Sequence, residues 1–198
     1  LFDRIEPGEP RVLIAGFGRF GQIVARVLRA RRIPFTALEV SQAQVDFVRR
    51  FGNKLYYGDA SRLEVLRAAG AGRAQVLVLA IDDVEASVRT AVLVRRHFPQ
   101  LRVLARARNR QHTFRLMDAG VAEIWRETLA SSLEVAEAAL VAIGTPRDTA
   151  AAQVRRFRAH DEETLLAQAA VKDDETKLVA TAQASAQQLE GLFEADAR

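Results

Sequence analysis

Residues 11–22 have the sequence Arg-Val-Leu-Ile-Ala-Gly-Phe-Gly-Arg-Phe-Gly-Gln, and this stretch decides the fold. A short apolar run stands directly before three glycines, Gly16, Gly18 and Gly21, in the spacing GxGxxG. The first glycine permits a tight strand-to-helix turn, the second lets a pyrophosphate approach the backbone, and the third allows close helix–strand packing. The stretch therefore predicts the strand, turn and helix that open a dinucleotide-binding βαβ unit.

The rest of the first 126 residues alternates short apolar runs with amphipathic stretches, a pattern typical of a parallel sheet with crossover helices. Strands are predicted at residues 11–15, 35–39, 54–57, 75–80, 102–105 and 121–124. Helices are predicted at residues 19–31, 41–51, 61–69, 83–97 and 110–119. We therefore expect an α/β fold, a Rossmann-type doubly wound parallel six-stranded sheet whose ligand lies at the carboxyl ends of the strands.

The composition changes after Trp125. Residues 128–143 are rich in Ala, Leu and Val and predict a long helix ending at Gly144, and the remaining residues favour helix without strand signals. Alanine-rich helices with few bulky side chains need a partner surface, which favours a homodimer or a docked neighbour. We expect a linker at residues 1–10, a nucleotide-binding domain at 11–126, and a crossover helix with a helical dimerisation and regulatory tail at 127–198.

Composition limits the classes of function. The chain has no cysteine, which excludes disulfides, thiolate nucleophiles and cysteine-ligated metals. Residues 1–126 hold 22 basic and 12 acidic side chains, whereas residues 127–198 hold seven and 13. The basic first part can attract phosphates and other anions. Its arginines are not interleaved with aromatic side chains, which argues against nucleic acid as a partner.

The opening of the chain is polar and broken by proline and glycine, and it does not begin with methionine. It lacks the basic-then-apolar pattern of a signal peptide, and no apolar run in the chain approaches the roughly 18 residues that span a bilayer. We therefore expect the chain to be a piece of a longer protein.

Glu39 ends the second predicted strand, 18 positions after Gly21. An acidic side chain at this place accepts hydrogen bonds from the hydroxyls of an adenosine ribose. The same carboxylate repels a 2′-phosphate, and the next residues, Val40 and Ser41, provide no arginine to neutralise it. We therefore expect the ligand to be AMP, NAD(H) or another adenosine nucleotide rather than NADP. The alternative is that Glu39 is a solvated acid in a loop.

Charged side chains also follow the other predicted strands. Asp59 can contact an adenine edge or cap a helix. Asp82 and Asp83 close the fourth predicted strand beside the site, or simply start the following helix. Arg19 and Arg106 can each face a phosphate, although a solvated surface position is the alternative for either one. The candidate nucleotide-binding residues are Gly16, Phe17, Gly18, Arg19, Phe20, Gly21, Glu39, Asp59, Ala60, Ile81, Asp82 and Arg106.

No catalytic residue and no metal ligand is predicted. The histidines His97, His112 and His160 fall in helical stretches without metal-ligand spacing and are expected to be surface or packing residues. A hydride-transfer enzyme also needs a substrate-holding domain with a positioned acid or base, for which the tail is poorly equipped. A small NAD-dependent oxidoreductase fragment is the alternative function, and a soluble nucleotide-sensing subunit of a separate channel is a third.

Further short motifs accompany the glycine loop, and together they are much more specific than the loop alone. The motifs are Arg50-Phe51-Gly52, Tyr57-Gly58-Asp59-Ala60, Ala80-Ile81-Asp82-Asp83, His97-Phe98-Pro99, Ala105-Arg106-Ala107-Arg108, Ala119-Gly120-Val121 and Arg126-Glu127-Thr128. With these motifs and the glycine loop, the chain resembles the RCK domain, also called KTN or TrkA-N, of Kef-type glutathione-regulated potassium/proton antiporters.

The resemblance implies a non-enzymatic regulatory domain at the cytoplasmic face of the inner (plasma) membrane. Such domains follow the membrane transporter portion of the same chain, form homodimers and bind AMP or NAD(H) in the Rossmann cleft. In glutathione-gated members, the gating ligand contacts two arginines and an asparagine; Arg26 and Arg126 match the arginines. The asparagine that follows Arg-Arg-Phe is replaced by Arg158. We therefore expect a retained nucleotide site and an altered or lost glutathione-type site.

Overall fold

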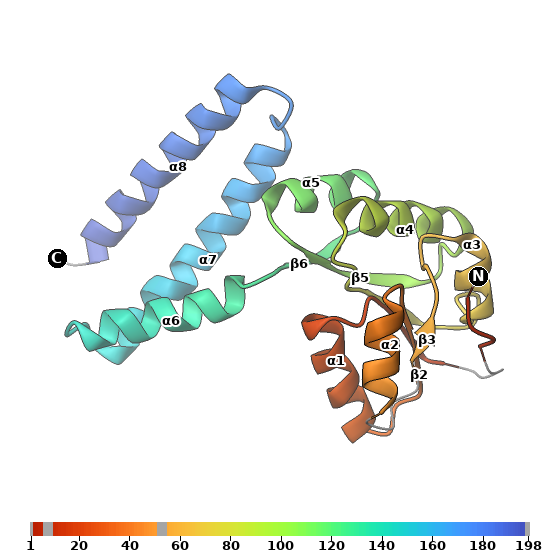
Figure 1. Cartoon of the computed structure of the whole chain (residues 1–198). Coiled ribbons are helices and arrows are strands. Elements are labelled where there is room, and N and C mark those ends of the chain that lie inside the picture. The colour runs from red at the N-terminus through yellow and green to blue at the C-terminus, as the bar shows by residue number, and fades with distance from the viewer. Residues whose placement is uncertain (1, 6–9, 51–54, 197–198) are drawn as a thin grey trace. The chain divides into compact units, whose positions relative to one another are not determined.

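The computed structural model describes residues 2–5, 10–50 and 55–196, which divide into two compact units, one ending at Glu127 and the other beginning at Thr128. The first unit contains one six-stranded parallel sheet, as predicted, and its strand order is β3-β2-β1-β4-β5-β6 (Figure 1). The strands are β1 (Val12–Ala15), β2 (Phe35–Glu39), β3 (Tyr56–Tyr57), β4 (Val76–Leu79), β5 (Arg102–Ala107) and β6 (Glu123–Arg126).

Helices cover both faces of this sheet. The helices of the first unit are α1 (Arg19–Ala30), α2 (Gln42–Arg49), α3 (Leu63–Ala68), α4 (Val84–His97) and α5 (Arg110–Asp118). One core cluster joins α1 and α2 to the sheet, and the other joins α3, α4 and α5 to it. Between β1 and β4 the order of the strands reverses, and an open α/β sheet binds its ligand at such a point.

The central strands are apolar on both faces, which is why the sequence shows continuous runs and not alternation. In β1, Leu13 packs in the cluster with α3 to α5, whereas Ile14 packs in the cluster with α1 and α2. Leu77 and Val78 of β4 divide in the same way. A side-chain period of two along a strand produces this division.

The glycine loop packs tightly on the end of β4. Gly16 has φ +92°, a conformation that L side chains rarely adopt, and its N–H donates to the carbonyl of Leu38 at 2.9 Å. A Cβ at Gly16 would lie 2.5 Å from the carbonyl oxygen of Ala80, and one at Gly21 would overlap the carbonyl oxygen of Gly16. Both glycines are therefore required by the backbone geometry of the turn.

The bounds of the fifth and sixth strands were predicted wrongly. The sixth strand was expected at residues 121–124 but begins at Glu123, because Gly120 and Val121 still close α5: the Val121 N–H donates to Leu116. The fifth strand was expected to end at Ala105 and continues to Ala107, where it pairs with Arg126. Arg106 therefore lies within β5 and not after it.

Smaller differences concern the second helix, the third strand and the start of the chain. α2 ends at Arg49, and the predicted end of this helix at Phe51 lies outside the described residues, as does Lys54 at the predicted start of the third strand. Asp3 lies beside β3, since its N–H donates to the carbonyl of Tyr57 at 2.8 Å and its carboxylate accepts the Tyr57 N–H at 2.6 Å.

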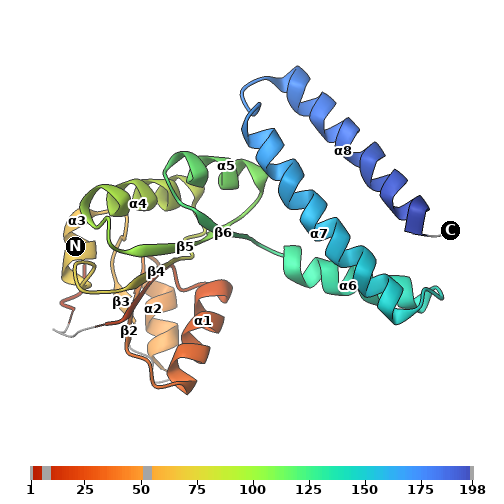
Figure 2. The same cartoon turned by 180° about the vertical axis from the view of Figure 1, so that it is seen from behind.

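The second unit consists of α6 (Leu129–Ala142), α7 (Arg147–Ala169) and α8 (Glu175–Asp196), in agreement with the predicted helical extension. Figure 2 shows α8 turning back along α7. Polar side chains lie between these two helices: His160 Nε2 is 2.9 Å from the carbonyl oxygen of Ser185, and the hydroxyls of Thr164 and Ser185 are hydrogen-bonded. In the part of the chain that the structure describes, no helix is long and apolar enough to cross a membrane.

Replacing Gly16 by alanine tests the strand-to-helix turn. Gly16→Ala is expected to lower the free energy of unfolding by about 2–4 kcal/mol, because it adds both a left-handed backbone penalty and an overpacked contact with Ala80. Gly72→Ala is the matched control, since its Cβ meets nothing within 4 Å, and it should change the stability by less than about 0.5 kcal/mol. Urea titration followed by circular dichroism measures both; equal stabilities would contradict the tight packing of the loop.

Candidate nucleotide-binding site

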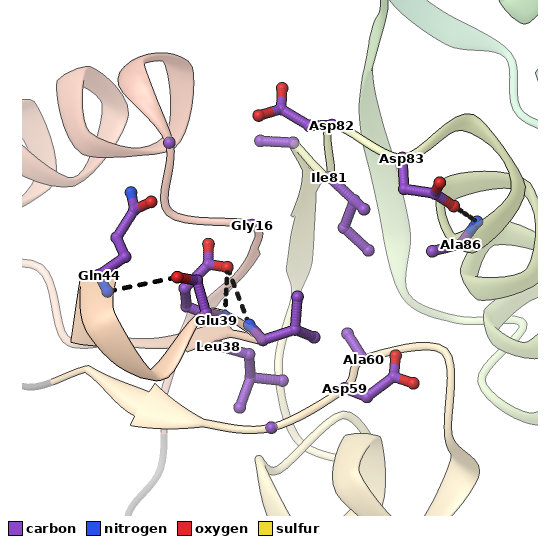
Figure 3. Close-up of a pocket in the computed structure, with 15 residues that line it drawn as sticks. Gly16, Leu38, Glu39, Gln44, Asp59, Ala60, Ile81, Asp82, Asp83 and Ala86 are labelled. Atoms are coloured by element: carbon purple, nitrogen blue, oxygen red, sulfur yellow. Dashed lines mark hydrogen bonds between the residues drawn. The ribbon is translucent and has the colours of Figure 1, made fainter. Parts of the chain in front are cut away.

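A cavity opens at the carboxyl ends of the central strands. Its volume, about 290 Å³, is close to the lower limit for small-molecule pockets. Of the predicted residues, it brings together Gly16, Gly18, Glu39, Asp59, Ala60, Ile81 and Asp82. Figure 3 shows Glu39 and Gln44 on one side of this cavity, with Ile81 and Asp83 across it. The cavity therefore lies where the order of the strands reverses.

Glu39 holds one wall of the cavity together. Its Oε2 accepts the N–H of Phe17 in the glycine loop at 2.8 Å, and its Oε1 accepts the N–H groups of Val40 and Ser41, each at 2.9 Å. Gln44 adds a second link, because its amide donates to the carbonyl of Phe17. These bonds join the end of β2 to the glycine loop and fix the direction of the carboxylate.

The glycine loop presents backbone and not side chains to the cavity. A Cβ at Gly18 would meet only the Asp82 carboxylate oxygen, at 3.6 Å, so a ligand can approach this backbone closely. The first N–H groups of a helix have no partner within the helix, and the positive end of the helix dipole favours an anion there. The first turn of α1 contains no acidic residue that could compete.

The aspartates at the cavity differ in their role at the helices. Asp83 is the N-cap of α4 and accepts the Ala86 N–H at 2.7 Å. Asp59 does not cap α3, whose N-cap is Arg62; it accepts the Ser61 N–H at 2.8 Å in the turn before that helix. Both aspartates line the cavity.

Arg106 is engaged by carboxylates of the protein. Its side chain is 6% exposed, and its guanidinium contacts Asp82 and Glu127, each at 2.5 Å. Burial on its own lowers the pKa of Arg106, but the hydrogen bonds to Glu127 and Asp82 outweigh burial and raise it. Arg106 is therefore a permanent cation. It lines a second small cavity of about 40 Å³ beside Gly18, together with Arg19 and Phe20.

The remaining predicted residues have supporting positions. The Phe17 side chain is buried in the core beneath the loop, and Gly21 is buried within α1. Asp83, which the sequence placed beside the site or at the start of a helix, also lines the cavity. The prediction omitted the lining residues Leu38, Val40, Ser41, Gln44, Gly58, Ala80 and Ala86. Most are neighbours of predicted residues at strand ends, so the strand boundaries could have identified them; Gln44 has no such signal.

The three arginines suggested for a gating ligand lie in different elements. Arg26 is exposed on α1 and lines a cavity of about 190 Å³ between α1 and α2. Arg126 ends β6, and Arg158 is exposed on α7 in the second unit. Among the described residues, no group of three His, Cys, Asp or Glu side chains could hold a metal ion.

Comparison with known proteins identifies the family. The family described as TrkA-N domain matches residues 12–127, and the family described as Potassium efflux system KefB C-terminal domain matches residues 131–198. The chain belongs to the TrkA-N domain family. The predicted resemblance to the RCK, KTN or TrkA-N domain of Kef-type systems is thereby confirmed.

Curated relatives of this TrkA-N chain are longer proteins. The glutathione-regulated potassium-efflux system protein KefC of Cronobacter sakazakii is 40% identical over 179 residues, which cover 90% of this chain and 29% of the relative. The chain therefore spans less than a third of the length of that KefC.

Solved structures resemble the TrkA-N chain as well. The Shewanella denitrificans Kef CTD in AMP-bound form is 39% identical, with a TM-score of 0.73 over 81% of this chain and 98% of that one. The GsuK channel bound to NAD is 19% identical, with a TM-score of 0.56 over 61% of this chain and 22% of that one, and it shows only a shared fold.

His112 makes the stability of the TrkA-N unit depend on pH. Its ring is 2% exposed; Nδ1 accepts the Arg108 N–H at 3.1 Å, so the hydrogen on Nε2 faces the Ser87 hydroxyl, also at 3.1 Å. Burial, followed by the charges of Arg106, Arg115 and Arg108, lowers the pKa of His112 below 6.5. The unfolded chain therefore binds this proton more readily, and stability falls as pH drops below about 6.5.

We expect the free energy of unfolding to decline as the pH falls below about 6.5. His112→Asn should flatten that decline while keeping an acceptor for the Arg108 N–H. His97→Asn, at an exposed position on α4, is the matched removal of a histidine and should keep the profile of the unaltered chain. Urea titrations at several pH values measure the three profiles. A His112→Asn profile as steep as that of the unaltered chain would assign the decline to other groups.

Proposed function

We propose that this chain is a non-enzymatic regulatory domain of a Kef-like potassium/proton antiporter, controlled by an adenosine nucleotide in the cleft. The observation that carries the proposal is the Glu39 carboxylate, fixed beside the open glycine loop at the carboxyl ends of the strands. The KefC relatives and the AMP-bound Kef CTD support the same role. AMP or NAD(H) is the proposed ligand.

The cleft supplies complementary groups for each part of AMP. The backbone at Gly18 and the N-terminus of α1 receive the phosphate. Glu39 accepts three N–H groups, and a carboxylate offers about four acceptor sites, so one site is left for a ribose hydroxyl. Leu38, Ala60 and Ile81 provide apolar surface for the adenine.

The acids at the cleft are proposed to bind and not to catalyse. Glu39, Asp59 and Asp83 accept backbone N–H groups, and Asp82 accepts the Arg106 guanidinium. Each of these carboxylates is thus already engaged by the protein, and none of them stands as a free, positioned acid or base. We therefore propose ligand binding as the function, with an oxidoreductase fragment as the rejected alternative.

The transporter portion of the same chain is the proposed partner, at the cytoplasmic face of the inner membrane, with a second copy of this chain in a homodimer. The second unit supports dimerisation by its exposed apolar side chains, such as Val135 on α6, 69% exposed, and Ile143, 82% exposed. A nucleotide can shift the transporter only by binding one of its conformations better than the other.

Glu39→Gln tests the nucleotide site. We expect the affinity for AMP to fall about 10- to 100-fold, because the variant loses a charge-assisted hydrogen bond to the ribose. Glu64→Gln is the control: Glu64 is an exposed acid on α3, paired with Arg62 and not part of the cleft. Isothermal titration with AMP and with NADH measures both variants. Absence of binding by the unaltered chain would refute the proposed function.

The glutathione-type site is proposed to be altered at Arg158. Titration of the unaltered chain with glutathione should give no heat at concentrations that saturate a micromolar site. Arg158→Asn restores the amide that the Kef pattern has at this position and is expected to gain binding, whereas Arg155→Asn, an exposed neighbour on α7, should not. Micromolar binding by the unaltered chain would overturn the proposed alteration.

A further inference from the structure

Arg106 is a buried cation shared by two carboxylates from different parts of the first unit. One terminal nitrogen contacts Asp82 at 2.5 Å and lies 3.4 Å from the carbonyl oxygen of Ala80, and the other contacts Glu127 at 2.5 Å. Its Nε is buried and has no acceptor in the described part of the structure. A guanidinium that lacks an acceptor at one of its nitrogens depends strongly on the two carboxylates that remain.

Asp82 connects this cation to the nucleotide cleft. Its side chain is 75% exposed, lines the large cavity and faces Gly18, where the proposed phosphate binds. A phosphate beside Gly18 would therefore place a second negative group close to the Asp82 carboxylate and close to Arg106. Two such anions repel each other, and both attract the buried guanidinium, so the distribution of Arg106 between Asp82 and Glu127 must change.

Glu127 connects the same cation to the helical part of the chain. Its N–H donates to the carbonyl of Ala107 at 2.7 Å, which makes it the last residue anchored to the sheet. Thr128 follows with φ +66°, a left-handed conformation that is uncommon for a threonine, and α6 begins at Leu129. The Arg106–Glu127 contact thus fixes the point from which α6 starts.

We infer that Asp82, Arg106 and Glu127 form a relay that transmits occupancy of the nucleotide cleft to the start of α6. Arg106 and Glu127 act as positioning residues: they do not line the large cavity, yet Arg106 holds a residue that does. Bound phosphate draws Arg106 toward the cleft and loosens its hold on Glu127. The inference rests on the proposed function, because it requires an anionic nucleotide at Gly18.

Glu127→Gln breaks the relay on the side away from the cleft. Glu123→Gln is a closely matched control, because Glu123 is also an ion-paired acid of β6 but pairs with Arg102. The experiment measures AMP affinity by isothermal titration and amide hydrogen exchange of residues 124–134 with and without saturating AMP. It is performed on the whole chain and on both variants.

In the unaltered chain and in Glu123→Gln, AMP should change exchange at residues 124–134 by about fivefold or more, the lower end of typical allosteric coupling. In Glu127→Gln, AMP should still bind within about threefold of the unaltered affinity, while the exchange response disappears. If Glu127→Gln gives no cooperative melt, Glu127→Asp replaces it, since it keeps the charge but withdraws it by one methylene.

The outcomes separate the two proposals. AMP binding without an exchange response in the unaltered chain, or an undiminished response in Glu127→Gln, overturns the relay and leaves the nucleotide site intact. No AMP binding by the unaltered chain overturns the proposed function and the relay with it. Loss of the exchange response in Glu123→Gln as well would show that removing either ion pair abolishes the response. The response would then not depend on Glu127 in particular, which also contradicts the relay.

Discussion

The close approach of the Gly16 turn to the end of β4 is the constraint on which the cleft depends. No side chain fits between Gly16 and the Ala80 carbonyl, so the glycine loop and the Ile81–Asp83 segment stand face to face across the cavity. The backbone of Gly18 stays open toward the same space. Close packing at Gly16 thus accompanies an open backbone at Gly18, where we propose that the phosphate binds.

Glu39 complements this packing by electrostatics. The carboxylate accepts the N–H of Phe17, so an acid at the end of β2 adds a further link to the tightly packed glycine loop. The negative charge of Glu39 is largely satisfied by backbone N–H groups, so the carboxylate can stand beside the loop that we propose to hold the phosphate. In that proposal, phosphate and ribose have separate places in the cleft.

Most of the fold was predictable because its signals are local. Continuous apolar runs such as residues 12–15 mark strands buried on both faces, and glycines such as Gly120 mark helix ends. The boundaries failed where neighbouring signals compete: the C-terminal cap of α5 extends into Val121 and delays β6. In the site, glycines and strand-end acids were predictable, but the role of Glu127 was not, since its contact with Arg106 spans 21 residues and depends on the pairing of β5 with β6.

The extension of β5 by two residues has a functional consequence. If the strand ended at Ala105, as predicted, Arg106 would be solvated and flexible. It would then contact a phosphate only as one of several cations in this basic unit. Within β5, its backbone is paired with Trp125 and its guanidinium is buried between Asp82 and Glu127. Burial of Arg106, and of most of Glu127, reduces the screening that weakens surface ion pairs. The proposed change at Asp82, which is itself 75% exposed, would therefore reach Glu127 through this cation. A cation in this position is better suited to linking two segments than to holding a ligand by itself.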